Sequence, residues 1–281
     1  MRKERGGQAA RLRSPRPLKV RSKGSETASP SARDEVERLS RFVARAGVAS
    51  RRRVDSLIEE GRVTVNGRPA VLGQKIRPGK DRVLVDGREI DRGEKPVYIL
   101  LYKPPGYLST CSDPHGRRTV MSLLKGVSSR VFPVGRLDYD AEGLMLMTND
   151  GKLAYLLSHP KHRVVKEYAV EIDGDRDESK IRQILSGIIV GGKKVTADYA
   201  RFASEKGKPL RLIIGVHEGE KHLVKHICHS VGYGVNRLIR TRVGSLGLTG
   251  LNAGAWRYLS PKEVEDLYAA ARKGWEGERG K

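Results

Sequence analysis

The sequence has little of what stabilises secreted proteins or anchors membrane proteins. It contains two cysteines, Cys111 and Cys228, without CxxC spacing, which argues against a disulfide framework and against a cysteine-based zinc module. The longest unbroken apolar run, VYILLY at 97–102, is far shorter than the roughly 20 residues that span a bilayer. The opening MRKERGGQAARLRS is charged and lacks the apolar stretch of a secretory signal. We therefore expect a cytoplasmic protein whose cysteines are reduced.

Acidic residues are also scarce relative to basic ones. The chain has 33 Asp and Glu against 55 Lys and Arg, which gives a formal net charge of +22. Solubility asks for a net charge of only about 2 to 8 in a small domain. The excess predicts a polyanionic partner, and nucleic acid is the first candidate. An anionic membrane surface fits less well, because the sequence contains no lipidation motif.

Composition and turn signals divide the chain into five parts. Up to residue 34 there are ten Lys or Arg, three acids and no aromatic residue, which is typical of a disordered basic arm. Farther along, charged segments that contain Gly or Pro separate the apolar patterns. The predicted parts are a basic arm at 1–35, a small module at 36–90, a linker at 91–96, a larger domain at 97–272 and a disordered tail at 273–281.

The small module is predicted to contain two helices followed by short strands, an αα-β arrangement. Apolar residues at helical spacing mark the first helix at 39–46, and Ser50 can cap the second. The segments VTVNG and VLVDG end in dipeptides that are typical of tight turns between strands. Arg51, Arg52 and Arg53 occupy the first turn of the second helix, where positive charge opposes the helix dipole. A bound external anion explains this cluster, and so does an ordinary charged surface.

The larger domain alternates apolar strand patterns with fewer helical ones. This composition predicts an α+β fold with a mainly antiparallel central sheet and flanking helices. The predicted strands are 97–102, 165–172, 194–202 and 211–217, and the last helix is predicted at 261–272.

A cluster of acids interrupts the basic larger domain in GRLDYDAEGLMLMTNDG, at 135–151. If the backbone is extended over 134–137, Arg136 and Asp138 point to the same side. A neighbouring guanidinium lowers the pKa of an aspartate by about 1 to 3 units, so Asp138 would be ionised and could act as a nucleophile or a base. A structural salt bridge explains the same spacing. The other acids are expected in the following loop or, for Asp150, in a turn with Gly151, and they are interpreted as structural or solvated: Asp140, Glu142 and Asp150.

Residues 221–231 predict an amphipathic helix with a cationic face. At about 100° per residue, the apolar side chains fall in one arc, and Lys225 lies at the centre of the opposite arc, where it is well placed to meet an acid. Three histidines in that arc could in principle bind zinc, but no carboxylate completes a motif such as HExxH. A basic face beside nucleic acid explains the arc without a metal. The cationic arc comprises Lys221, His222, Lys225, His226 and His229.

The strand pattern VKEYAVEI carries a candidate for base recognition. Alternation along a strand places Lys166 and Tyr168 on one face. Tyr168 could stack on a nucleobase, or it could pack in the core with a hydrogen-bonded hydroxyl.

These segments together resemble a known family. GRLDYDAEGLMLMTNDG is similar to the G-R-L-D-x-x-T-x-G-L-x-x-x-T-N-D-G motif of the RsuA/RluB-type ribosomal RNA pseudouridine synthases. The small module resembles the S-four-type RNA-binding module, with two helices followed by V-x-V-N-G. Four further segments stand in the order expected of the family: KPPGYLST (103–110), SHPKHRVVKEYAV (158–170), EGEKHLVKHICHSVGYGVNRLIRTRVG (218–244) and LTGLNAGAWRYL (248–259).

The resemblance implies an enzyme that isomerises a uridine of ribosomal RNA to pseudouridine, without a metal or an organic cofactor. Whether the essential aspartate attacks the ribose, adds to the base or removes a proton stays open. The roles that the resemblance implies are the catalytic aspartate for Asp138, stacking under the uracil for Tyr168, pairing with the aspartate for Lys225, and lining of the pocket by Leu246 or Leu248. Substrate contacts are further expected from Arg136 and Lys166, and RNA contacts from Arg51, Arg52 and Arg53.

The small module and the basic arm favour 23S RNA of the large subunit as the partner, and we expect a monomer. Two other functions remain as alternatives. A non-catalytic RNA-binding assembly factor would not need Asp138, Tyr168 and Lys225, all of which are intact. A metal-dependent nuclease would use the histidine arc, which lacks a hydrolase-type carboxylate.

Overall fold

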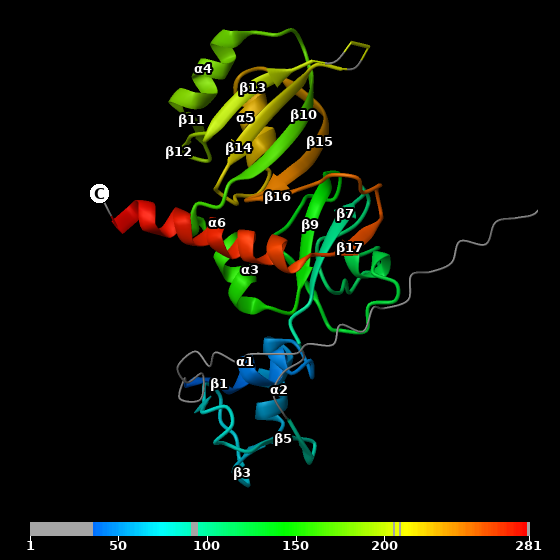
Figure 1. Cartoon of the computed structure of the whole chain (residues 1–281), viewed down its shortest axis with the longest axis vertical. Coiled ribbons are helices and arrows are strands. Elements are labelled where there is room, and N and C mark those ends of the chain that lie inside the picture. Colours follow the sequence, from blue (N-terminus) through cyan, green and yellow to red (C-terminus); the bar gives the residue numbers. More distant parts are fainter. Residues whose placement is uncertain (1–35, 91–94, 205, 208, 280–281) are drawn as a thin grey trace, which may run out of the picture.

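The computed structural model describes residues 36–90, 95–204, 206–207 and 209–279. The predicted basic arm and most of the predicted linker lie outside these residues. Within them, no helix is long and apolar enough to cross a membrane. Figure 1 shows the N-terminal module at one end of the molecule and the larger domain beyond it.

The N-terminal module has the predicted helices and short strands around its own apolar core. Ser50 caps the second helix by accepting a hydrogen bond from the backbone N–H of Arg53 at 3.2 Å, as predicted. Asn66 and Asp86, at the predicted turns, both have positive φ, as two-residue hairpin turns require. Its elements are β1 (Glu37–Arg38), α1 (Leu39–Arg45), α2 (Arg51–Glu59), β2 (Val63–Val65), β3 (Arg68–Pro69), β4 (Lys75–Ile76), β5 (Val83–Val85) and β6 (Arg88–Glu89).

In the described residues, the larger domain is built on one nine-stranded sheet. Seven strands follow the order β13-β14-β10-β15-β9-β7-β17, with β16 paired to β15 and β8 paired to β9. The strands are β7 (Tyr98–Lys103), β8 (Phe132–Val134), β9 (Glu142–Thr148), β10 (Lys166–Asp173), β13 (Tyr199–Ala203), β14 (Arg211–Val216), β15 (Gly234–Val243), β16 (Leu246–Gly247) and β17 (Trp256–Tyr258).

The sheet consists of two antiparallel halves that meet along one parallel pair of strands. β15 and β9 run parallel over two residue pairs, Ile239 with Glu142 and Arg240 with Gly143. The other strand pairs of the described sheet are antiparallel. The prediction of an α+β fold with a mainly antiparallel sheet is therefore confirmed.

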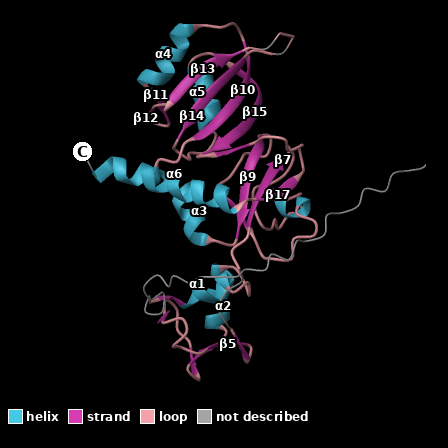
Figure 2. Cartoon of the chain, viewed as in Figure 1, coloured by secondary structure: helices cyan, strands magenta, loops and turns pink. Residues whose placement is uncertain are grey.

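Helices cover opposite faces of the two halves (Figure 2). One core lies between the sheet and α4 and α5, and it includes Val170 and Ile227. A second core lies between β7, β9 and the pair α3 and α6, and it includes Leu144 and Leu267. The remaining elements are α3 (Gly151–Ser158), α4 (Glu178–Ser186), α5 (Leu223–Ser230), α6 (Pro261–Arg279), the short helices η1 (Val120–Leu123) and η2 (Pro160–His162), and the hairpin β11 (Ile188–Val190) and β12 (Lys193–Val195).

Two boundaries differ from the sequence prediction. The predicted strand 194–202 is split into two strands, because β12 pairs with β11 whereas β13 pairs with β14 of the large sheet. The last helix continues to Arg279, past its predicted end at residue 272. The sequence predicted disorder for the tail at 273–281, but the backbone of residues 273–279 is helical.

Candidate active site

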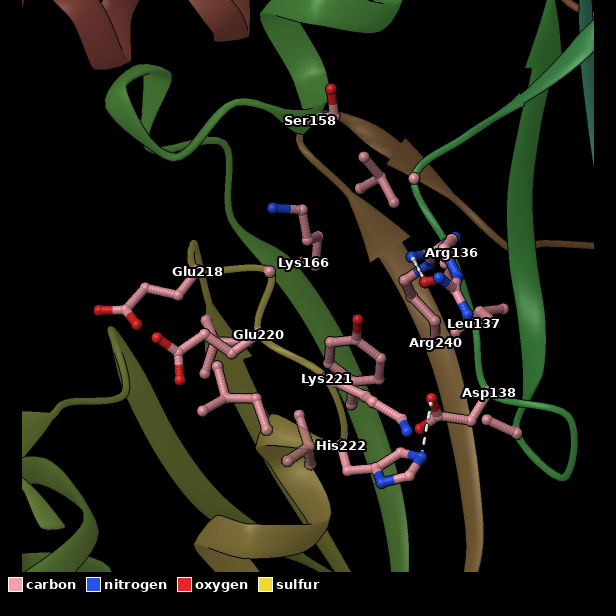
Figure 3. A pocket seen from close by; sticks show the side chains of 18 of the residues that line it. Arg136, Leu137, Asp138, Ser158, Lys166, Glu218, Glu220, Lys221, His222 and Arg240 are labelled. Carbon is pink, nitrogen blue, oxygen red and sulfur yellow. Dashed lines mark hydrogen bonds and ion pairs between the residues drawn. The ribbon is translucent and has the colours of Figure 1, made fainter. Parts of the chain in front are cut away.

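A cavity of about 320 Å³ lies where the two halves of the sheet meet. The loop 135–141 forms one wall, and strands β10 and β15 contribute Tyr168 and Arg240. The segment that leads into α5, residues 218–222, forms the opposite rim (Figure 3). This volume is within the range of roughly 300 to 1,000 Å³ that is usual for small-ligand pockets.

Asp138 is presented to the cavity by a loop that a buried lysine holds in place. Lys103 has no exposed surface, and its Nζ donates to the main-chain oxygens of Ala141 at 2.6 Å and Asp138 at 3.0 Å. Ser109 adds a second tie, because its hydroxyl donates to the oxygen of Leu137 at 2.7 Å. Burial lowers the pKa of Lys103 to about 8. The Asp138 carboxylate is therefore fixed through its backbone and remains one-quarter exposed.

The histidine that begins the α5 segment lies beside this carboxylate. His222 has a left-handed backbone with φ of 57°, and its Nε2 lies 3.4 Å from Oδ1 of Asp138. Figure 3 shows the two side chains meeting at one end of the cavity.

Lys166 and Tyr168 both line the cavity from β10, as the predicted alternation requires. The Lys166 Nζ donates to the main-chain oxygen of His217 at 2.8 Å. Burial, and to a smaller extent the charge of Arg240, lowers the pKa of Lys166 to about 8. Tyr168 is only partly buried, which leaves its ring accessible to a ligand.

Sequence reasoning missed Arg240, a buried cation of the cavity wall. Its side chain is 3% exposed, and it pairs across the sheet with Tyr168. The sequence contained one indication of this position, because alternation in RLIRTRV places Leu238 and Arg240 on one face of a strand. The strand register with β10 that brings this face to Tyr168 contains a bulge and is not visible in the sequence.

Comparison with known proteins gives the same architecture. Residues 97–230 match the family model of RNA pseudouridylate synthase, and residues 37–81 match the S4 domain. The ribosomal large subunit pseudouridine synthase B of Bacillus subtilis (strain 168) is 40% identical over 242 residues, which are 85% of this chain and 98% of that protein. The protein of the same name from Vibrio cholerae is 37% identical over 82% of this chain and 74% of its own length.

This chain belongs to the RNA pseudouridine synthase family. A solved structure of a pseudouridylate synthase agrees, with a TM-score of 0.58 and 26% identity over 82% of this chain and 99% of that chain. The resemblance drawn from the sequence motifs and from the N-terminal module is thereby confirmed, and so is the expectation of an enzyme.

In this pseudouridine synthase the predicted pairing of Lys225 with Asp138 is not what the structure shows. The Lys225 Nζ donates to Oδ2 of Asp140 at 2.6 Å, and this hydrogen bond lowers the pKa of Asp140. The reason is the start of α5: the left-handed turn at His222 directs the imidazole, rather than the lysine one turn later, toward Asp138.

Arg136 also differs from its predicted geometry. The strand ends at Val134 and Gly135 has φ of 72°, so residues 134–137 are not extended throughout. Arg136 lines the cavity with an exposed side chain, while its main-chain oxygen accepts a hydrogen bond from Arg240 at 3.3 Å. The synthase therefore orients Asp138 by contacts to the backbone of its loop. The alternation of the sequence had instead predicted an adjacent guanidinium.

The two leucines that the resemblance offered as pocket residues lie elsewhere. Leu246 is buried, and Leu248 is packed against the same apolar cluster, which includes Leu144 and Leu267. Leu238 of β15 lines the cavity instead. Leu246 and Leu248 follow the turn that ends β15, so their side chains support the sheet from the face that α6 covers.

The other acids of the motif have structural roles. Glu142 was expected in the loop, but it begins β9 and is 4% exposed. Of the two interpretations offered for it, structural or solvated, the structure shows the first, because its carboxylate accepts hydrogen bonds from Tyr102 at 2.9 Å and from Arg237. Burial opposes ionisation of Glu142, yet these hydrogen bonds outweigh it and lower its pKa. Asp150 caps α3 by accepting from the N–H of Lys152 at 2.9 Å.

Part of the predicted cationic arc lies on α5, but Lys221 and His222 precede the helix, which begins at Leu223. The apolar arc of α5 is buried, including Val224 and Ile227, while His226 and His229 are exposed. Arg51, Arg52 and Arg53 are exposed on the first turn of α2. Within the described part of the chain, no three His, Cys, Asp or Glu side chains converge as a metal site would need.

Proposed function

We propose that this synthase converts a uridine of large-subunit (23S) ribosomal RNA to pseudouridine in the cavity that Asp138 and Tyr168 line. The observation that carries the proposal is that one cavity brings together a carboxylate, an accessible aromatic ring and several cations. Phosphates require cations around such a site, and the reacting nucleoside requires one carboxylate within it.

The reaction needs no co-reactant, because the atoms of substrate and product are the same. The bond between ribose C1′ and N1 of uracil breaks, the base rotates, a bond from C1′ to C5 forms, and the proton on C5 is released as N1 acquires one. A uridine within RNA must first leave its stack, at a cost of a few kcal/mol that stacking on Tyr168 offsets in part. Asp138 acts on the ribose or on the base, and the ion pair of Lys225 with Asp140 holds α5 to the loop that carries Asp138.

The large-subunit assignment rests on the relatives and on the N-terminal module. Relatives from Bacillus subtilis and Vibrio cholerae are named for the ribosomal large subunit. The exposed Arg51, Arg52 and Arg53 supply cations for RNA phosphates. The proposal includes action as a monomer in the cytoplasm, where bacterial ribosomes are assembled.

The test uses large-subunit ribosomal RNA whose uridines carry tritium at C5. Isomerisation changes no mass but releases the C5 hydrogen, so the protein should release tritium in proportion to pseudouridine formed. Mapping of pseudouridines in a strain that lacks this protein should show a missing site. RNA binding without tritium release, together with unchanged maps, would favour the non-catalytic assembly factor.

A further inference from the structure

The distance between the two principal site residues depends on the junction between the halves of the sheet. Asp138 follows β8, which pairs with β9, whereas Tyr168 lies on β10, which pairs with β15. The described strands connect these halves through the β15 and β9 pairing, which has only two residue pairs. A small change at this junction would move the carboxylate relative to the tyrosine ring.

Arg240 spans this junction with a single side chain. It lies on β15 opposite Tyr168, and its Nε donates to the main-chain oxygen of Leu144 on β9 at 2.7 Å. Its Nη1 donates to the main-chain oxygen of Arg136, two residues before Asp138, at 3.3 Å. Figure 3 shows the guanidinium of Arg240 beside Arg136. One planar group thus connects the strand next to the tyrosine, the opposing strand and the aspartate loop.

Gly143 permits the close approach that these contacts need. It is paired with Arg240 and has φ of 110°, a conformation that favours glycine. A Cβ at this position would lie 2.4 Å from the main-chain oxygen of Arg240 and 2.7 Å from its nitrogen. Both atoms belong to the backbone, so a side chain at 143 would force β9 and β15 apart at Arg240.

The burial of the Arg240 charge shows that this arrangement is costly to the fold. The side chain is nearly inaccessible, and its Nη2 has no hydrogen-bond partner in the part of the chain that the structure describes. Burying an ion is unfavourable, and an apolar residue of similar size often stabilises a core as well or better. A guanidinium is distinguished by its planar fork, which bonds two fixed acceptors at once.

We infer that Arg240 is a positioning residue for the isomerisation, and that Gly143 allows it to act. Arg240 sets the separation of Asp138 and Tyr168 through the two carbonyl oxygens that it holds. The inference rests on the proposed function, and it assigns the residue no contact with substrate.

The opposite face of the same junction offers a matched control. Arg237 also belongs to β15 and crosses to β9, where its Nη2 donates to the Glu142 carboxylate at 3.1 Å. Tyr102 donates to the same carboxylate at 2.9 Å. Arg237 is on the face away from the cavity and 44% exposed, so it supports the junction without touching the loop of Asp138.

The experiment compares Arg240→Met, Arg240→Lys and Arg237→Met in the full chain. Tritium release gives kcat and KM, binding gives the RNA affinity, and thermal unfolding gives Tm. For Arg240→Met we expect kcat to fall about 100-fold with RNA affinity within about threefold, because misplacement of reacting groups by about 1 Å has that consequence. Arg240→Lys should recover part of kcat, since it keeps the charge but not the fork. Arg237→Met should lower Tm but keep kcat within about threefold of the parent.

The inference is overturned if Arg240→Met keeps the parental kcat, or if both methionine variants lose kcat in proportion to Tm. If Arg240→Met does not fold, Arg240→Lys and Gly143→Ala test the inference in its place. Parental kcat in both of these variants would contradict a positioning role for Arg240. A parent protein that releases no tritium would instead overturn the proposed function, and the two failures are therefore distinguishable.

Discussion

The N-terminal module and the active site use cations in opposite ways. In the module, Arg62 lies at the surface, 42% exposed, and donates to Glu60 at 2.9 Å and to Asp86 at 2.7 Å. In the active site, Lys103 and Arg240 are almost inaccessible and donate to main-chain oxygens. The module pairs this cation with carboxylates at the surface, whereas the active site buries its cations against main-chain oxygens.

This difference indicates what each set of cations does. Surface ion pairs contribute about 0 to 1 kcal/mol, so an acid can be exchanged for an RNA phosphate at little cost. Buried cations bonded to backbone oxygens cannot be exchanged in this way, and their loss leaves acceptors without partners. Substitutions in the module should therefore change affinity, and substitutions in the active site should change rate and stability.

Asp138→Asn tests the active-site side of this comparison with the largest expected effect. The substitution is nearly isosteric and removes the charge that a nucleophile or base requires, so tritium release should disappear. Folding and RNA affinity should stay close to the parent, because the loop is held through its backbone. Release near the parental rate by a folded variant would show that Asp138 is not the catalytic residue.

Lys103→Met should combine a loss of stability with a loss of rate. The methionine is of similar length but leaves the oxygens of Asp138 and Ala141 without their donor. We expect the free energy of unfolding to fall by about 2 to 4 kcal/mol. Denaturant unfolding measures this loss, and tritium release at a temperature where the variant is folded measures the rate. Full stability with full activity would mean that the loop does not depend on Lys103.

The sequence predicted the elements of this architecture better than their contacts. Hydrophobic spacing and the Ser50 cap located α2, and alternation placed Tyr168 on the face that lines the cavity. These features are local, since each depends on the geometry of one helix or strand. Four of the predicted site residues line one cavity: Arg136, Asp138, Lys166 and Tyr168.

The contacts that could not be predicted depend on how separate elements align. The partner of Lys225 follows from the left-handed turn at His222, which alters the direction in which α5 begins. The place of Arg240 follows from a bulge in the pairing of β10 with β15 and from the parallel junction with β9. The spacing of residues within one element does not specify strand register or bulges. The sequence therefore identified the motif residues but not their contact partners.

Lys166 gives a smaller, pH-dependent effect. Its pKa of about 8 lies below the value of about 10.4 for an unfolded chain, so the folded protein binds fewer protons between these values. Below pH 8 the buried Lys166 is charged and destabilises the folded state by the full cost of its burial. As pH rises from about 8 to about 10.4 this cost is relieved, so the free energy of unfolding increases. Activity should change in the opposite sense, because the cavity loses a cation above pH 8.

The comparison of parent and Lys166→Met isolates this group from Lys103, which has a similar pKa. In urea unfolding between pH 8 and 10, the difference in stability between the two proteins should change by up to about 1.4 kcal/mol per pH unit, the value for one proton. A difference that is constant with pH would mean that Lys166 does not titrate in this window.

The smallest effect is expected in the module, where Arg52→Ser and Arg62→Ser each remove one charge. Arg52 is exposed on the first turn of α2, where a cation opposes the helix dipole, whereas Arg62 is held by Glu60 and Asp86. If Arg52 meets an RNA phosphate, its loss should flatten the slope of log affinity against log salt by roughly 0.7 to 0.9 and leave kcat and Tm unchanged. Arg62→Ser should flatten the slope less, because that arginine already neutralises acids, and it should lower Tm slightly. Equal slopes for the two variants would mean that net charge alone, rather than the position of Arg52 at the helix end, determines how the module binds RNA.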